Sequence, residues 1–337
     1  PLMELVTEPD FKDGPAARVF AEELQRILRY LDASSADMEK GQMRVEANIS
    51  VAPEGAPWGT KVEVKNLNSF RAVEGAIAYE IARQSALLDE GGKVVQETRG
   101  WDDVKNKTVS QRKKEEAHDY RYFPEPDLPP LQLSKLGWDF EKIKRELPEL
   151  PEAKRARFAK ELGLAPEQAG ILTADKAWAD YFEAAISELS TESGGENDRA
   201  RLLCYNYLTS DFRGLLDEKG TDLRESKITP ENFADLIVLI AADKISSRAA
   251  KDILRKMEEE GVDPRAIIER EGLAQESNAV ALEETAKAVL AANPKAVEDY
   301  KQGKSAALQF LVGKSMARML GKGNPPMLQE IFKRLLG

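Results

Sequence analysis

The chain has 337 residues, with 49 basic and 59 acidic side chains and a net charge of −10. This length is enough for two or three domains with separate cores, and 42% hydrophobic residues is typical of a soluble globular protein. We find neither an apolar run that could cross a membrane nor the start of a signal peptide. The single cysteine, Cys204, cannot form an internal disulfide, so we expect a reducing, cytoplasmic location.

The apolar residues 2–6 predict a strand that ends before Pro9. Because the sequence begins inside such a pattern and without Met, we expect an N-terminally incomplete chain. A native start at Pro1 is the alternative.

Residues 1–146 predict an α+β domain with an antiparallel sheet. Apolar and polar residues alternate strictly over residues 44–51 and again over 61–65, and the loop between them is rich in Pro and Gly, which favours a pair of antiparallel strands. Residues 70–88 have helical periodicity after a cap at Asn68 or Ser69. Further strands are expected within 93–101 and 107–113.

Two helical regions follow the sheet, an all-helical domain over residues 147–226 and a small helical tail domain over 227–337. In the tail domain a capping residue followed by Pro marks four helix starts, at 229–230, 263–264, 293–294 and 324–325. The starts have no constant spacing, so they do not indicate a solenoid repeat.

Polar side chains gather on one face of the predicted strand pair: Arg44, Glu46, Asn48, Lys61, Glu63 and Lys65. A solvated surface with cross-strand ion pairs is the simpler interpretation. The same set also fits a nucleotide–magnesium site, because carboxylates bind hard cations and Lys or Arg binds phosphate oxygens. Glu4 and Glu8 add two more carboxylates.

Known catalytic patterns are missing: the sequence has no GxxxxGK[ST] phosphate loop, no GxGxxG, no GxSxG and no HExxH. A Cys–His nucleophile pair would need Cys204 and the single histidine, His118. Cys204 lies in an apolar helical pattern, which argues against a reactive thiol. On chemistry alone the sequence therefore predicts only an α+β protein with a helical, basic tail.

The tail is basic although the chain is acidic. Residues 300–337 carry 7 basic and 1 acidic side chains, whereas residues 1–130 carry 18 basic and 24 acidic ones. This asymmetry indicates a polyanion partner at the C-terminal end, with a solvated helix face as the alternative. The candidate contacts to RNA are Lys314, Arg318 and Lys322.

Five long segments occur in an order that resembles one family, the GatB subunit of the aspartyl/glutamyl-tRNA(Asn/Gln) amidotransferase. They are "PLMELVTEPD", "DMEKGQMRVEANISV", "GTKVEVKNLNSFRAVEGAIAYEIARQ", "GGKVVQETRGWD" and "KKEEAHDYRYFPEPDLPPL". The resemblance covers nearly the whole chain, and long motifs in this order are more specific than any short pattern.

The resemblance implies a catalytic cradle domain, a helical domain and a tail domain that binds tRNA. It also implies a ligase that uses ATP and Mg²⁺ to phosphorylate the side-chain carboxylate of Glu-tRNA(Gln) or Asp-tRNA(Asn). Ammonia that a partner amidase releases from glutamine would then give Gln-tRNA(Gln) or Asn-tRNA(Asn). The expected partners are subunits A and C of the amidotransferase, in a heterotrimer, and the tRNA; the first of these subunits is the amidase.

The resemblance also implies site residues. Those expected to contact the nucleotide or the acyl terminus are Arg44, Glu46, Asn48, Lys65 and Asn66. Glu4 is the expected magnesium ligand in this chain, and the family's other metal ligands would lie upstream of Pro1. The family commonly has Asp where this chain has Glu46, which shifts the carboxylate oxygens. His118 and Arg121 lie in the fifth segment and are expected to form a wall of the site.

A second interpretation keeps the fold without the chemistry. A truncated relative that lost the kinase would be a non-catalytic tRNA-binding or assembly protein. The two interpretations differ in whether the complete gene product forms ADP.

Overall fold

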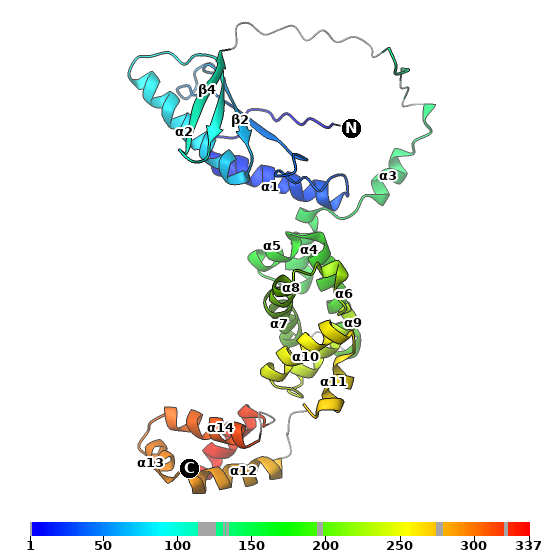
Figure 1. Cartoon of the computed structure of the whole chain (residues 1–337), viewed down its shortest axis with the longest axis vertical. Coiled ribbons are helices and arrows are strands. Elements are labelled where there is room, and N and C mark those ends of the chain that lie inside the picture. Colours follow the sequence, from blue (N-terminus) through cyan, green and yellow to red (C-terminus); the bar gives the residue numbers. More distant parts are fainter. Residues whose placement is uncertain are drawn as a thin grey trace. The chain divides into compact units, whose positions relative to one another are not determined.

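The computed structural model describes residues 2–113, 126–130, 132, 135–193, 198–273, 279–319 and 323–337. The predicted site residues His118, Arg121 and Lys322 lie outside these ranges. The chain forms two compact units, residues 1–158 and residues 159–337 (Figure 1). Each unit is described by itself below.

The first unit contains a four-stranded sheet with the order β1-β2-β3-β4. The strands are β1 (Val45–Ile49), β2 (Val62–Leu67), β3 (Glu97–Asp102) and β4 (Lys107–Lys113). β1–β2 and β3–β4 pair antiparallel, whereas β2–β3 pair parallel. The α+β prediction is confirmed, but the prediction of an antiparallel sheet is wrong for β2–β3. The reason is that helix α2 (Phe70–Asp89) connects these strands, and a helical crossover returns the chain in the same direction.

The strand pattern places an apolar core between the sheet and α2. Val62, Val64 and Leu67 are buried and pack with Val73 and Ala76 of α2. Ser69 caps α2 by accepting a hydrogen bond from the Ala72 N–H, and both the cap and the helix are as predicted.

Helix α1 (Gly14–Tyr30) packs against α2 on the same side of the sheet (Figure 1). The contact is close at Gly14, where a Cβ would lie 2.4 Å from the Glu74 carbonyl oxygen. Any larger residue at this position would separate the two helices.

Every element after β4 that the structure describes is helical. The first unit ends with α3 (Phe140–Glu146) and the start of α4 (Pro151–Leu162). The second unit continues with α5 (Pro166–Thr173), α6 (Lys176–Ser193), α7 (Asp198–Asn206), a π-helix (Tyr207–Phe212), α8 (Arg213–Lys219), a short 3₁₀ turn (Leu223–Glu225), α9 (Pro230–Ala241), α10 (Ser247–Glu260) and α11 (Pro264–Glu271).

Aromatic side chains form the centre of this part of the second unit. Phe212 of the π-helix stacks on Phe233 of α9, with ring centroids 5.4 Å apart, and Tyr181 of α6 contacts both rings. The Tyr181 hydroxyl donates a hydrogen bond to the Ile228 carbonyl. These contacts hold α9 against α6.

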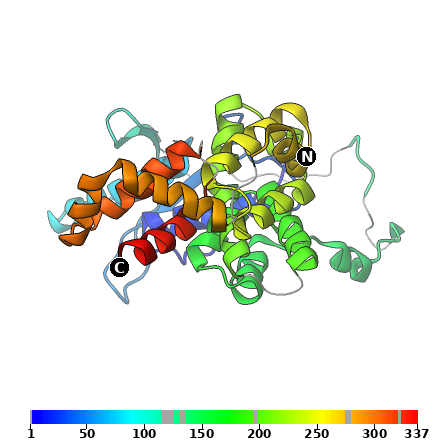
Figure 2. The ribbon, with the colours of Figure 1, turned by 90° about the horizontal axis from the view of Figure 1, so that it is seen from below.

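Four helices form a bundle with its own core: α12 (Ala279–Ala292), α13 (Pro294–Lys301), α14 (Ala306–Arg318) and α15 (Pro325–Leu336). Leu282, Leu311, Leu328 and Phe332 are fully buried in that core. The four helices lie side by side in both views (Figures 1 and 2). We refer to this bundle as the tail bundle.

The helix starts predicted from a capping residue and Pro are confirmed, because α9, α11, α13 and α15 begin at the four prolines. Thr229, Asp263 and Asn324 accept capping hydrogen bonds, whereas Asn293 does not. The domain boundaries after residues 146 and 226 remain predictions.

Candidate active site

The face of the sheet opposite α2, called the outer face below, carries three of the predicted polar residues in contact. The Lys65 ammonium lies 3.2 Å from a Glu46 carboxylate oxygen and 3.8 Å from one of Glu63. Glu63 also accepts a hydrogen bond of 2.9 Å from the Thr98 hydroxyl of β3. Two carboxylates and an amine therefore meet on one surface, and the Glu46 side chain is 46% exposed.

Asn66 joins this face because β2 is bulged. Val45 pairs with Leu67 and Ala47 pairs with Val64, so β2 has one more residue than β1 between these pairs. Asn66 takes a left-handed backbone conformation, φ 63°, which asparagine tolerates better than most residues. The bulge turns Leu67 back into the core and leaves the Asn66 side chain exposed next to Lys65.

The other predicted strand residues lie close by without contacts of this kind. Asn48 is exposed and pairs with Glu63 across the strands, and Arg44 is exposed immediately before β1. Lys61 is exposed immediately before β2. The structure therefore brings together Glu46, Glu63 and Lys65, with the remaining predicted residues along the same two strands.

The strand predicted for residues 2–6 is wrong. These residues have no regular secondary structure, and Glu4 and Glu8 are exposed. Among the described residues, no group of three or more acidic, His or Cys side chains lies close enough to hold a metal ion. The role of Glu4 in metal binding remains a prediction.

Three residues of the outer face, Thr98, Gly100 and Gln111, were not among those predicted for the site. A Cβ on Gly100 would meet the side chains of both Gln111 and Asn66. A glycine inside a predicted strand often marks the close approach of another group, so "TRGW" was the available signal. The pairing of β3 with β2 was needed to interpret it.

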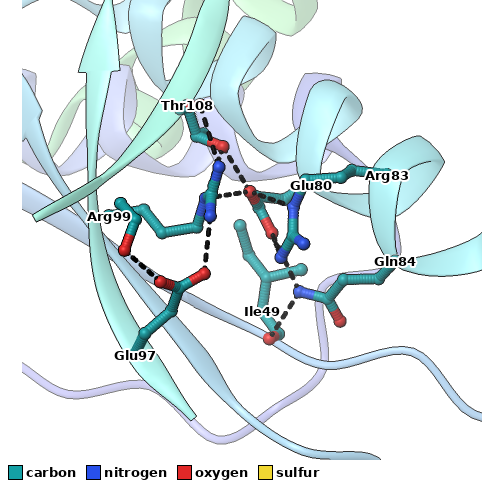
Figure 3. Close-up of polar contacts among 8 residues, drawn as sticks. Ile49, Glu80, Arg83, Gln84, Glu97, Arg99 and Thr108 are labelled. Carbon is teal, nitrogen blue, oxygen red and sulfur yellow. Dashed lines mark hydrogen bonds and ion pairs between the residues drawn. The ribbon is translucent and has the colours of Figure 1, made fainter. Parts of the chain in front are cut away.

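A buried polar network lies on the inner face of the sheet, against α2 (Figure 3). The fully buried Glu80 carboxylate accepts hydrogen bonds from Arg83, Gln84 and Thr108 and lies 3.1 Å from the Arg99 guanidinium. Burial favours the neutral acid, but the hydrogen bonds from Arg83, Thr108 and Gln84 outweigh it, so the pKa of Glu80 is lowered.

The same network joins α2 to three strands (Figure 3). Gln84 donates to the Ile49 carbonyl of β1, and Arg99 of β3 donates to Thr108 of β4. Glu97 pairs with Arg99 and accepts a hydrogen bond from Ser110. The inner network therefore fixes the strands whose other side forms the outer face.

In the tail bundle, two of the predicted RNA contacts lie one turn apart on α14. The Lys314 ammonium lies 5.3 Å from the centre of the Phe310 ring, and that ring is 47% exposed. Arg318 is exposed one turn further, and α14 contains no acidic residue. An exposed aromatic ring beside cations is a common surface for nucleic acid.

Cys204 has the opposite character from a reactive thiol. It is fully buried in α7, and burial raises the pKa of its thiol. A raised pKa keeps the side chain protonated and therefore unreactive. Its hypothetical partner His118 lies outside the described residues.

Comparison with known proteins identifies the family. Residues 1–138 match the family described as "GatB/GatE catalytic domain", and residues 180–336 match the one described as "GatB domain". The aspartyl/glutamyl-tRNA(Asn/Gln) amidotransferase GatB subunit of Herpetosiphon aurantiacus is 45% identical over 336 residues, which are 99% of this chain and 68% of the relative. This chain belongs to the GatB family of tRNA amidotransferase subunits.

Other members of the GatB family match equally broadly. The protein of Dehalococcoides mccartyi strain ATCC BAA-2266 is 45% identical over 100% of this chain and 68% of its own length. The protein of Persephonella marina is 43% identical over 100% of this chain and 69% of its own length. The outer face belongs to the part that matches the catalytic domain.

A search of the described residues for helices long and apolar enough to span a membrane found none.

Proposed function

We propose that this chain carries the kinase and amidation site of a glutamine-dependent tRNA amidotransferase, a ligase that forms a carbon–nitrogen bond. It would use ATP to phosphorylate the side-chain carboxylate of Glu-tRNA(Gln) or Asp-tRNA(Asn). Ammonia from the partner amidase would then displace phosphate and give Gln-tRNA(Gln) or Asn-tRNA(Asn). Identity of 45% to a GatB protein over 99% of the chain carries this proposal.

The chemistry explains why ATP is needed. A carboxylate is a poor acylating agent because its oxygen leaves as an unstable anion, whereas an acyl phosphate has a good leaving group. The protein must hold two anions, the carboxylate and the triphosphate, in line with each other and reduce the repulsion between them. Lys65 supplies a positive charge on the outer face for this purpose.

The residues of the outer face fit Mg²⁺ together with ATP. Magnesium usually binds one or two carboxylates along with phosphate oxygens and water, and Glu46 and Glu63 place two carboxylates within 4 Å of the same Lys65 ammonium. Bound there, the cation would neutralise phosphate charge. Glu4 is a further candidate ligand.

The remaining predicted residues would position the substrates. The Arg44 guanidinium can hold a phosphate or carboxylate through two hydrogen bonds, and the Asn48 and Asn66 amides can donate to the same groups. The proposed roles of His118 and Arg121 as a wall of the site stand on the resemblance.

The proposal is tested with the complete gene product, the partner subunits A and C, glutamine, Mg²⁺, Glu-tRNA(Gln) and labelled ATP. We expect ADP and Gln-tRNA(Gln), and we expect both to be lost in Glu4→Gln and Glu46→Gln. Tight tRNA binding without ADP would instead identify a non-catalytic tRNA-binding or assembly protein. Asp-tRNA(Asn) in a parallel assay identifies the preferred substrate.

The tail bundle is proposed to bind the tRNA backbone through Lys314, Arg318 and Lys322. Reversing a charge that contacts a phosphate weakens binding and makes it less dependent on salt. We expect Lys314→Glu with Arg318→Glu to lower tRNA affinity about tenfold or more and to flatten its salt dependence.

Lys287→Glu is the control, because Lys287 lies in the same bundle but pairs with Glu283 at 2.7 Å. If this control weakened binding as much as the double variant, only the net charge would matter, and specific contacts through α14 would be ruled out.

A further inference from the structure

Gly100, in the middle of β3, lies beneath two side-chain amides on the outer face. A Cβ at this position would lie 2.2 Å from the Gln111 amide nitrogen and 3.2 Å from that of Asn66. The two nitrogens therefore approach the same point above the strand. Gly100 itself is buried, whereas Asn66 and Gln111 are exposed. We call the space above Gly100 the notch.

Both amides come from irregular positions in the strands that flank β3. Asn66 belongs to the bulge of β2. In β4, Arg99 pairs with Ser110 and Thr98 pairs with Arg112, so Gln111 is an extra residue between these pairs. A bulge re-aims a side chain that regular pairing would place elsewhere, and bulges are common next to active sites. Two bulges here direct amides to one glycine.

Lys65 adds a charge to the notch. It pairs with Gly100 across the parallel strands, so the two residues face the same side of the sheet. An ammonium and two amide groups can all donate hydrogen bonds. Such a set of donors is suited to an anionic oxygen and would repel a cation.

We infer that the notch binds an anionic oxygen of a substrate, either the side-chain carboxylate of the misacylated tRNA or a terminal phosphate of ATP. This inference rests on the proposed function, and it assigns Gln111 and Gly100 to the site. Gln111 and Asn66 donate hydrogen bonds to the oxygen, and Gly100 leaves the space in which it lies.

The geometry separates binding from folding. In Gly100→Ala the new methyl group meets the end of the exposed Gln111 side chain, which can rotate away. The positive-φ glycines do not include Gly100, so alanine fits its backbone. The variant should therefore fold normally with a displaced amide and a filled notch.

The first experiment observes the amides directly. The chain is labelled with ¹⁵N at Asn and Gln side chains, and the NH₂ signals are followed by NMR during separate titrations with glutamate, inorganic phosphate and ATP. Asn66→Asp and Gln111→Leu assign the two signals. We expect both signals to shift together and saturably with at least one of these anions.

The variants measure how much the notch contributes. Loss of a hydrogen bond to a charged group lowers affinity about tenfold, so Gly100→Ala and Gln111→Leu should raise the Kd by about that factor. Gln309→Leu, which removes an exposed glutamine of α14, should leave it unchanged. Signals that do not move with any anion, or an equal Kd in Gly100→Ala, would overturn the inference.

A second experiment identifies the source of the oxygen. In the reconstituted complex, Gln111→Glu places a negative charge in the notch, whereas Gln111→Lys restores a donor. A KM for aminoacyl-tRNA raised about tenfold in Gln111→Glu alone indicates the carboxylate, and the same change in the KM for ATP indicates the phosphate. If both KM values stay within about twofold, the notch does not bind either substrate and the inference fails.

The two experiments also separate this inference from the proposed function. A wild-type complex that forms no ADP contradicts the proposed function. The NMR titration of the same chain still decides whether the notch binds an anion.

Discussion

The inner and outer faces of the sheet carry the same kinds of side chain in opposite surroundings. On the inner face, Glu80 and Arg99 are buried between α2 and the strands, and their polar atoms bond mainly to each other and to threonine, serine and amide groups. On the outer face, Glu46 and Lys65 form a similar pair that is about 40–46% exposed. Water screens the outer pair, so its net contribution to stability is small.

The difference separates a structural use of charge from a functional one. A buried charge whose partner is removed costs several kcal/mol, which fixes the inner network in place. An exposed pair can exchange its partner for a ligand at little cost. The sheet therefore holds its strands from one side and presents replaceable charges on the other.

The largest expected effect is on the inner face. Glu80→Ala leaves the buried Arg99 and Arg83 without their carboxylate and should destabilise the first unit by about 3–5 kcal/mol. Because the two units need not unfold together, hydrogen exchange of the β3 and β4 amides, measured by mass spectrometry, is the suitable readout.

Glu46→Ala is the matched control on the outer face and should cost less than about 1 kcal/mol. Equal protection in the two variants would remove the distinction between the faces.

The second effect is on activity. Lys65→Met removes the ammonium but keeps the length of the side chain, and should lower the kcat/KM of the reconstituted complex about 100-fold. Hydrogen exchange in β2 should stay near that of the wild type. A variant that is destabilised yet fully active would show that the outer face is only a solvated surface, the simpler interpretation of the sequence.

The third effect is a pH dependence that belongs to the inner face. The folded-state pKa of Glu80 lies below its ordinary value of 4.5, so its ionised form stabilises the fold above that pH. This contribution is lost as the pH falls through the lower, folded-state pKa.

Glu80→Gln cannot titrate, so its stability should fall less than that of the wild type on acidification below about pH 4.5. Urea unfolding of both proteins between pH 7 and pH 3, followed by hydrogen exchange in β3, measures the difference. Parallel curves would mean that Glu80 does not contribute to acid sensitivity.

The sequence predicted the elements whose signals are local. Thr229, Asp263 and Asn324 followed by Pro mark helix starts because the cap and the proline act on the first turn alone. Likewise, the strict alternation of residues 44–51 and 61–65 predicted β1, β2 and their antiparallel pairing.

What the sequence did not predict depends on residues far apart. The parallel pairing of β2 with β3 places Lys65 beside Gly100, although the strand–helix–strand order was a usable sign of it. The bulges at Asn66 and Gln111 depend on register between strands. They decide which side chains reach the outer face, so the candidate site could be predicted only in part.

The smallest expected effect separates the backbone of the bulge from its side chain. Asn66 has a φ of 63°, which costs most residues about 1 kcal/mol but costs glycine nothing. Asn66→Ala should therefore lose about 1 kcal/mol of stability, whereas Asn66→Gly should lose none. Both variants lack the amide, so both should show the same reduced activity. If Asn66→Gly kept full activity, the bulge would serve only to return Leu67 to the core, and the outer face would act through its charges alone.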